Sequence, residues 1–175
     1  DIVRVDSFNN ADYQIEFKNY DDQNGEVSPL IIDKVTDNKV TFVITNTAQE
    51  AQLGFLLNQN DEHAILLHSK YTKQDKAEWF DRVYKCFKQN GSGNFQILRS
   101  GPIVQASLNI SCERMFTDMT SPENWLQRLG RLDRFDSNNS LNLYTTVLPK
   151  SAETGKQSSS KAKFLANEAS IRPLK

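Results

Sequence analysis

The chain has 175 residues, of which 38% are hydrophobic and 25% are charged, and its formal net charge is −1. This composition is ordinary for a soluble protein with one core-bearing domain, and the net charge does not indicate a general affinity for nucleic acid. No apolar run is long enough to cross a membrane and no signal-peptide pattern is present, so the sequence predicts a cytoplasmic protein without a membrane partner.

Short apolar runs alternate along the chain with segments of helical periodicity. Strands are expected at residues 13–18, 40–45, 64–67, 95–98, 114–117 and 141–148. Helices are expected at residues 29–36, 48–58 and 73–88, and from Pro122 onward. Strands separated by helices form βαβ units, so the predicted fold is α/β with a mostly parallel sheet. Ligands of such sheets bind beyond the carboxyl ends of the strands.

The sequence changes character after the last predicted strand. Residues 151–160 are rich in Ser, Thr, Gly and Lys, which is typical of a linker, and residues 161–169 have the pattern of a short helix. We therefore divide the chain into a domain at 1–149 and a linker with the start of a C-terminal extension at 150–175. Because the chain has no initiating methionine, we expect it to be part of a longer protein.

The most informative stretch runs from Gln127 to Arg134 and reads QRLGRLDR. Arg128, Arg131 and Arg134 are spaced so that they would share one face of a helix. Such a face is best tolerated opposite a strongly negative group, and a guanidinium grips phosphate oxygens in pairs. Gly130 would let a ligand or another backbone come close. The alternative for such a pattern is a solvated basic face.

We expect Trp125, Leu126 and Leu129 to supply much of the packing of this helix.

The stretch QRLGRLDR resembles motif VI of superfamily-2 helicases, whose pattern is Q/H-R-x-G-R-x-x-R. The wider stretch 97–134 is similar to motifs V and VI of the CRISPR-associated type I helicases, while 41–52 and 66–83 resemble that family's motif IV and its L-L-H-S segment. The resemblance implies a RecA-like fold and the second lobe of a two-lobe motor. It further implies an ATP-dependent enzyme acting on single-stranded DNA, whose partners are a first helicase lobe and a CRISPR RNA-guided surveillance complex.

The resemblance also implies roles for the motif VI residues. Arg131 and Arg134 would act as arginine fingers on the γ-phosphate of ATP, with Gln127 near that phosphate or the catalytic water. The residues expected on the nucleotide side are Arg128, Gly130 and Asn109. Of these, Arg128 is also expected to tie motif VI to its own lobe.

Two groups of candidate nucleic-acid residues each follow a predicted strand. Asn46 and Thr47 follow the strand at 40–45, and Ser69 follows the strand at 64–67; both places begin helices, whose free N–H groups bind phosphates. The resemblance assigns these residues to the path of single-stranded DNA. For Asn46, an ordinary helix cap is an equally good interpretation.

Motif V departs from its family. The common pattern A-T-Q-x-x-E-Q-S-L-D-I is read here as SGPIVQASLNI. Gly101 stands where a threonine usually meets a DNA phosphate, and Ser100 is the candidate to supply a hydroxyl instead. Asn109 stands where an aspartate usually lies near the nucleotide sugar. These changes indicate either a divergent subgroup or an altered coupling between ATP and DNA.

Other patterns fail as sites. Gly155-Lys156 lacks the upstream glycine and the following hydroxyl residue of a phosphate-binding loop, so this chain alone is expected to be inactive. Cys86 and Cys112 are the only cysteines and lack metal-ligand spacing, so no metal is assigned to this lobe. ATP is the expected cofactor, held with Mg²⁺ mainly by the first lobe. Two alternatives stay open: a RecA-like module that has lost catalysis and scaffolds a partner, and another superfamily-2 motor.

Overall fold

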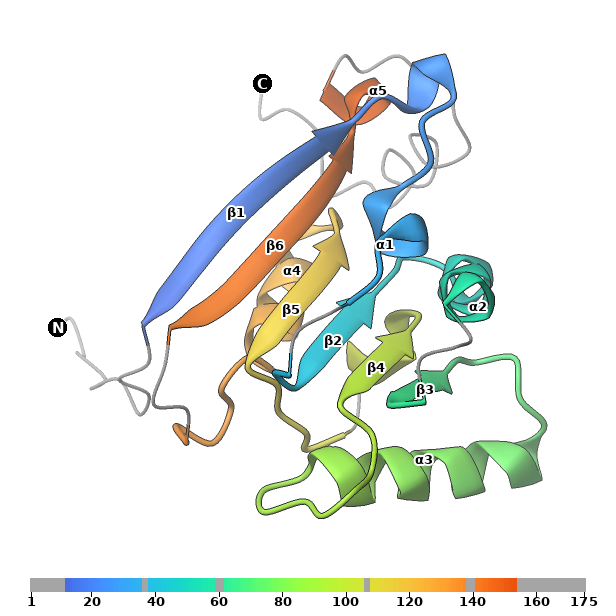
Figure 1. Ribbon diagram of the computed structural model, residues 1–175, viewed down its shortest axis with the longest axis vertical. Coiled ribbons are helices and arrows are strands. Elements are labelled where there is room, and N and C mark those ends of the chain that lie inside the picture. The colour runs from blue at the N-terminus through green and yellow to red at the C-terminus, as the bar shows by residue number, and fades with distance from the viewer. Residues whose placement is uncertain (1–11, 36–37, 59–61, 106–107, 138–140, 154–175) are drawn as a thin grey trace, which may run out of the picture.

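The structure, a computed structural model, describes residues 12–35, 38–58, 62–105, 108–137 and 141–153. Its centre is one six-stranded sheet in the order β1-β6-β5-β2-β4-β3, in which every neighbouring pair is parallel (Figure 1). The strands are β1 (Tyr13–Tyr20), β2 (Thr41–Ile44), β3 (Ala64–Leu67), β4 (Ile97–Ser100), β5 (Arg114–Asp118) and β6 (Asn142–Pro149). The helices are α1 (Pro29–Ile32), α2 (Ala48–Leu57), α3 (Lys73–Phe87), α4 (Pro122–Leu129) and α5 (Lys150–Glu153), with short 3-10 turns η1 (Asp22–Asn24) and η2 (Pro102–Gln105). The predicted α/β fold with a parallel sheet is confirmed.

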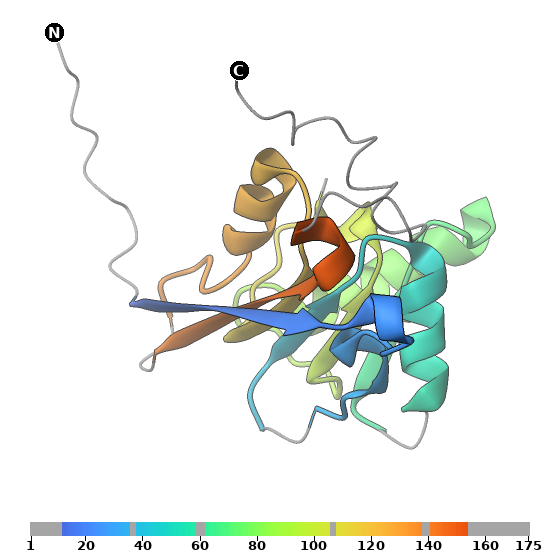
Figure 2. The same ribbon diagram turned by 90° about the horizontal axis from the view of Figure 1, so that it is seen from above.

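Helices cover both faces of the sheet, with α4 on one side and α1 on the other (Figure 2). Successive side chains of a strand point to opposite faces, so the neighbours Phe42 and Val43 enter different cores. The larger core lies under α3, α4 and η2, and includes Phe42, Val83, Leu98, Met115, Leu132 and Tyr144. The smaller core lies under α1, and consists of Tyr20, Leu30, Val43 and Val147 with Val35 and Phe116 against it. Because both faces are covered, the central strand β2 is wholly buried, and all of its residues except Thr41 are apolar.

Tertiary contacts shift two of the predicted boundaries. The first predicted helix was expected to reach residue 36, but α1 ends at Ile32. Arg99 of β4 explains the early end, because its Nη1 donates to the carbonyl of Leu30 at 2.8 Å and its Nη2 donates to that of Asp33 at 3.0 Å. These carbonyls therefore have hydrogen-bond donors without a further helical turn. The strand predicted at 95–98 begins two residues later, at Ile97, where Gln96 and Ile97 both donate to the carbonyl of His63.

The chain beyond β6 starts as part of the same packed unit. Ser151 of α5 is fully buried, and its backbone N–H donates to Asp22 Oδ1 at 3.0 Å. Lys150 forms an ion pair with Asp21 at 2.9 Å. The short helix predicted at 161–169 lies outside the described residues. Among the residues that the structure does describe, no helix has both the length and the apolar character needed to cross a membrane.

Candidate nucleotide and nucleic-acid site

Helix α4 carries the start of the arginine-rich stretch but ends before its second arginine. Ser121 caps the helix by accepting a hydrogen bond from the backbone N–H of Asn124, Pro122 occupies the first turn, and Gly130 is the C-cap. The expectation that all three arginines share one helical face is therefore wrong, because only Arg128 lies in the helix. Leu126 was also expected to pack, yet it is 59% exposed, whereas Trp125 and Leu129 do pack against the larger core.

A contact distant in sequence ends this helix. The backbone N–H of Cys112 donates to the carbonyl of Arg131 at 3.0 Å, and the N–H of Asp133 donates to the carbonyl of Cys112 at 2.8 Å. After α4 the chain thus forms a short parallel bridge, in which Leu132 pairs with Cys112 just before the start of β5. Asp133 adopts the left-handed conformation, with φ of 47°, which turns the chain further. Arg131 and Arg134 are consequently held in turns on either side of the bridge residue Leu132.

Arg128 is buried at the centre of its own lobe, with 1% of its surface exposed. Its Nη1 donates to Thr117 Oγ1 at 2.6 Å and to the carbonyl of Asp118 at 3.1 Å. Its Nη2 donates to Asn46 Oδ1 at 3.0 Å. The guanidinium therefore joins α4 to the ends of β5 and β2, which is the role expected of it within its own lobe. In this conformation it is not presented to a ligand outside the lobe.

Arg131 and Arg134 differ in their access to solvent. Arg131 is 9% exposed, and its Nη1 donates to the carbonyl of Leu108. The side chain of Arg134 is exposed, with Nε donating to Asn109 Oδ1 and Nη1 donating to the carbonyl of Gly130 at 3.2 Å. The structure thus brings two of the predicted nucleotide-side residues, Asn109 and Gly130, into contact with the predicted finger Arg134. Burial lowers the pKa of Arg131, and the nearby positive charge of Arg134 lowers it further.

Gly130 and Gln127 are both exposed, and Gly130 is in contact with Arg134 through its carbonyl. A Cβ built on Gly130 would meet nothing nearer than the carbonyl of Leu126 at 3.6 Å, and its φ of −67° suits any residue. This lobe by itself therefore gives no reason for a glycine at that position. Gln127 is exposed, and its amide donates to Glu123 Oε1 at 3.5 Å, one turn earlier in α4.

The predicted DNA residues meet at the carboxyl ends of three neighbouring strands, because Ile44 and Leu67 both pair with Ser100. Two of their side chains point inward. The amide of Asn46 donates to the carbonyl of Met119 at 2.7 Å, and its backbone N–H donates to Asp118 Oδ2 at 2.9 Å. Ser100 is fully buried and its hydroxyl donates to the carbonyl of Leu67 at 2.8 Å. Asn46 is neither an exposed ligand nor a helix cap in this structure.

Of the other three residues of this set, Thr47 and Ser69 reach the surface of the edge, whereas Gly101 is buried beneath the start of α2. Thr47 is the N-cap of α2, and its hydroxyl oxygen accepts from the backbone N–H of Glu50 at 3.1 Å. Ser69 is exposed. A Cβ on Gly101 would lie 3.2 Å from the backbone N and Cα of Ala48, so the glycine lets β4 end close against the start of α2. A larger residue at 101 would press on the helix N-terminus.

His68 organises the turn that carries Ser69. Its Nδ1 accepts from the backbone N–H of Lys70 at 3.1 Å, and its Nε2 lies 3.0 Å from the amide of Gln52. The ring stacks on Tyr71, with centroids 3.9 Å apart, and burial lowers the pKa of the imidazole. Because Nδ1 accepts from the backbone, the neutral ring carries its proton on Nε2, and this N–H donates to Gln52 when the amide oxygen faces the ring. His68 therefore has a local structural role, since its two ring nitrogens bind the turn and α2.

Two buried carboxylates that build the site, Asp118 and Asp133, were not among the predicted site residues. Asp118 is fully buried and accepts from Asn46. Asp133 is also fully buried, and its two oxygens accept from Ser137 N–H at 2.9 Å and from Asn142 Nδ2 at 3.2 Å. An aspartate directly after a buried strand was the available signal for Asp118. Within the described residues, no cluster of His, Cys, Asp and Glu has the arrangement of a metal site.

Comparison with known proteins agrees with this geometry. Residues 37–137 match the model of a family described as CRISPR-associated nuclease/helicase Cas3, C-terminal. The chain belongs to this family. It is 24% identical over 119 residues to a putative CRISPR-associated nuclease/helicase Cas3 of Methanocaldococcus jannaschii, covering 65% of this chain and 16% of that protein. It is 31% identical over 97 residues to the CRISPR-associated endonuclease/helicase Cas3 of Escherichia coli K12, covering 53% of this chain and 11% of that protein.

Solved structures share the fold. T. fusca Cas3-ADP superposes with a TM-score of 0.73 at 17% identity, over 85% of this chain and 20% of that chain. A chain of a structure described as a CRISPR RNA-guided surveillance complex, pre-nicking, gives a TM-score of 0.57 at 22% identity, over 77% of this chain and 19% of that chain. The sheet is therefore that of a RecA-like helicase lobe. The chain spans only 11% to 16% of the length of the curated relatives that it matches.

Proposed function

We propose that this chain is the second motor lobe of an ATP-dependent helicase that translocates on single-stranded DNA in CRISPR interference. The observation that carries the proposal is the pair of arginines at the end of α4. The described acceptors of Arg134 are the carbonyl of Gly130 and the amide oxygen of Asn109, neither of which neutralises its positive charge. Two guanidiniums held near one another in this way are best satisfied by an incoming phosphate.

Arg134 is the better candidate for the catalytic finger. It is exposed at the outer surface, and its Nε is oriented by Asn109. Among the described residues no carboxylate forms an ion pair with it. Gly130 beside it leaves room for a ligand or for the first lobe. Arg131 lies deeper, and we assign it to orienting the segment and adding positive potential as charge develops on the transferred phosphoryl group.

The DNA path in this proposal runs over the carboxyl ends of β2, β4 and β3. Thr47, Ser69 and the free backbone N–H groups at the start of α2 make the contacts, which are to phosphates and independent of base sequence. Asn46 and Ser100 support this edge from inside. Arg128 binds Asn46 directly, so one side chain links the nucleotide-side helix to the DNA-side edge. A guided CRISPR complex and the first lobe are the proposed partners.

The isolated chain should not hydrolyse ATP measurably. It has no phosphate-binding loop, so it lacks the elements that hold the β- and γ-phosphates and Mg²⁺ in the ground state. The measurement is phosphate release by the purified 175-residue chain with Mg²⁺-ATP and single-stranded DNA. Turnover comparable to that of a complete motor would contradict the assignment to a single lobe.

Removing the hydroxyl of Ser69 should weaken DNA stimulation rather than chemistry. In a longer protein that carries this lobe, Ser69→Ala should raise the DNA concentration needed for half-maximal ATPase activity by roughly three- to tenfold. This factor corresponds to the net free energy of one hydrogen bond, and kcat should change little. Gln74→Ala on exposed α3 is the matched control. For Thr47, Thr47→Ser retains the cap and should bind DNA normally. If Ser69→Ala behaves like the control, the DNA path does not include this turn.

A further inference from the structure

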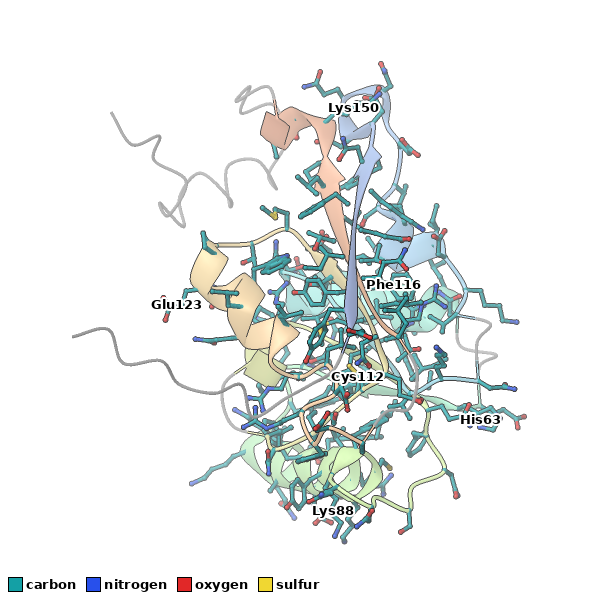
Figure 3. All side chains as sticks on the ribbon, turned by 90° about the vertical axis from the view of Figure 1, so that its left-hand side faces the viewer. His63, Lys88, Cys112, Phe116, Glu123 and Lys150 are labelled. Carbon is teal, nitrogen blue, oxygen red and sulfur yellow. The ribbon has the colours of Figure 1, made fainter. Side chains whose placement is uncertain are left out.

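A recess of about 300 Å³ lies on the sheet face opposite α4, beside α1 and the segment that follows it. Its floor is apolar and consists of Val43, Phe116 and Val147, with Pro29, Leu30 and Val35 from the covering segment. Figure 3 places Phe116 on the side of the sheet that faces α1, and Glu123 of α4 on the other side. The recess is therefore separated by the sheet from Arg134 and the proposed nucleotide face.

Positive charge is concentrated around this recess. Its lining contains four cationic residues and one acidic residue, which are Lys18, Lys34, Arg99, Arg114 and Asp33. The chain as a whole has a formal charge of −1, so this concentration is local. The nearest further acid on the same face of β1 is Glu16, which lies 3.5 Å from Thr145 Oγ1. Like charges around an apolar recess raise its potential and favour an anionic ligand.

The sheet register fixes these side chains relative to one another. Val43 pairs with Arg99 on one side and with Phe116 on the other, so the three residues form one row across β4, β2 and β5. Lys18 pairs with Val147 on the two strands beyond them. The cations therefore surround the apolar floor on strands whose positions the ladder holds, and only Lys34 comes from the covering segment.

The two arginines have different tasks. Arg99 is 3% exposed and fastens the covering segment by donating to the carbonyls of Leu30 and Asp33. Arg114 is half-buried, and its guanidinium lies over the ring of Phe116, 4.6 Å from the ring centre. An arginine placed on an aromatic ring offers a flat, cationic surface, on which a nucleobase stacks while nearby ammonium groups bind its phosphate.

We propose that this recess is a second nucleotide site, one that takes a single phosphate-bearing nucleotide unit. The base lies on Arg114 above Phe116, and the phosphate lies between Lys18 and Lys34. The unit comes either from a free nucleotide or from a strand of single-stranded nucleic acid, because both present the same base and phosphate. This site is independent of the motor function proposed for the opposite face.

The test is an NMR titration of the ¹⁵N-labelled 175-residue chain. Adding AMP in one arm and a short oligo-dT in the other should shift the amide signals of Lys18, Lys34 and Val147. Saturation by AMP identifies the free nucleotide as ligand, and a response to the oligonucleotide alone identifies a strand unit. Shifts confined to Asn109 and Arg134, or no shifts at all, would overturn the second site. The first of these results would leave the motor proposal standing.

Paired variants separate this site from general surface charge. Lys18→Gln with Lys34→Gln should weaken binding by roughly tenfold, because two charge-assisted contacts near the surface are lost. Lys73→Gln with Lys85→Gln, on α3, makes the same charge change elsewhere and should leave affinity unchanged. Arg114→Lys should reduce the preference for AMP over inorganic phosphate, since the stacking surface is lost. Equal weakening by the two lysine pairs, or equally tight binding of a poly-glutamate peptide, would contradict a nucleotide site.

Discussion

Replacing Arg134 with alanine in a longer protein that carries this lobe should lower DNA-stimulated ATP turnover by about 10³- to 10⁵-fold, the range of a lost arginine finger. ATP binding should remain nearly intact, because the first lobe holds the ground-state nucleotide and the finger acts on charge that appears in the transition state. Unwinding should be lost with turnover. The measurement is steady-state ATPase at saturating single-stranded DNA, run beside a nucleotide-binding assay.

The control variants follow from the geometry around Arg134. Arg134→Lys should not restore activity, because an ammonium cannot grip two phosphate oxygens in one plane. Arg82→Ala removes an exposed arginine from α3 and should turn over normally. Arg131→Ala should also impair turnover. Its effect combines catalysis with stability, because Arg131 is largely buried and donates to the carbonyl of Leu108. Asn109→Ala should lower turnover less than Arg134→Ala, since it removes only the group that orients Arg134 Nε.

Two outcomes would change the interpretation. If Arg134→Ala loses ATP binding and turnover in equal proportion, the arginine holds the nucleotide in the ground state. If turnover is normal, the end of α4 has no part in the chemistry. The alternative of a RecA-like module that scaffolds a partner would then be favoured, and the absence of a hydroxyl at Gly101 and of a charge at Asn109 would support it.

The sequence was sufficient for the sheet because its strands are encoded locally. The run at 64–67 is bounded by polar residues and becomes β3 with the predicted ends. The end of α4 could not be predicted in the same way. It is set by the pairing of Arg131 and Asp133 with Cys112, which lies about twenty residues away and is itself buried. A periodic pattern continued through this point, and a tertiary contact overrode it.

Site residues were predicted better by position than by orientation. Residues at the ends of β2, β3 and β4 do gather at one edge, because parallel strands end together. The burial of Asn46 and Ser100 could not be foreseen, since it depends on Met119 and Leu67 supplying acceptors across the sheet. Arg99 presents the same difficulty, because an arginine inside an apolar strand gives no local sign that α1 will cover it.

Replacing Arg128 with alanine should produce the largest loss of stability of any single change in motif VI. The change removes the donor to Thr117 Oγ1, to the carbonyl of Asp118 and to Asn46 Oδ1, all within 3.1 Å of the guanidinium. Buried acceptors left without a donor cost about 1–3 kcal/mol each, and the vacated volume adds a cavity term. We expect the free energy of unfolding to fall by roughly 3–5 kcal/mol, which for a domain of this size lowers Tm by roughly 10 °C.

Thermal and urea unfolding of the isolated chain measure this effect, and the adjacent residue supplies the control. Gln127→Ala lies on the same helix but is exposed, so it should change stability by no more than about 0.5 kcal/mol. The stability of Arg128→Lys should lie between those of Arg128→Ala and Gln127→Ala. A lysine ammonium keeps the positive charge but cannot reach acceptors on both β5 and the end of β2. A double-mutant cycle with Asn46→Ala tests the link itself, and a coupling of roughly 0.5–3 kcal/mol is expected for two side chains in one buried network. Additive effects would mean that Arg128 fills space without joining the nucleotide face to the DNA edge, and the proposed route of communication between them would then have to pass through the backbone of β5 instead.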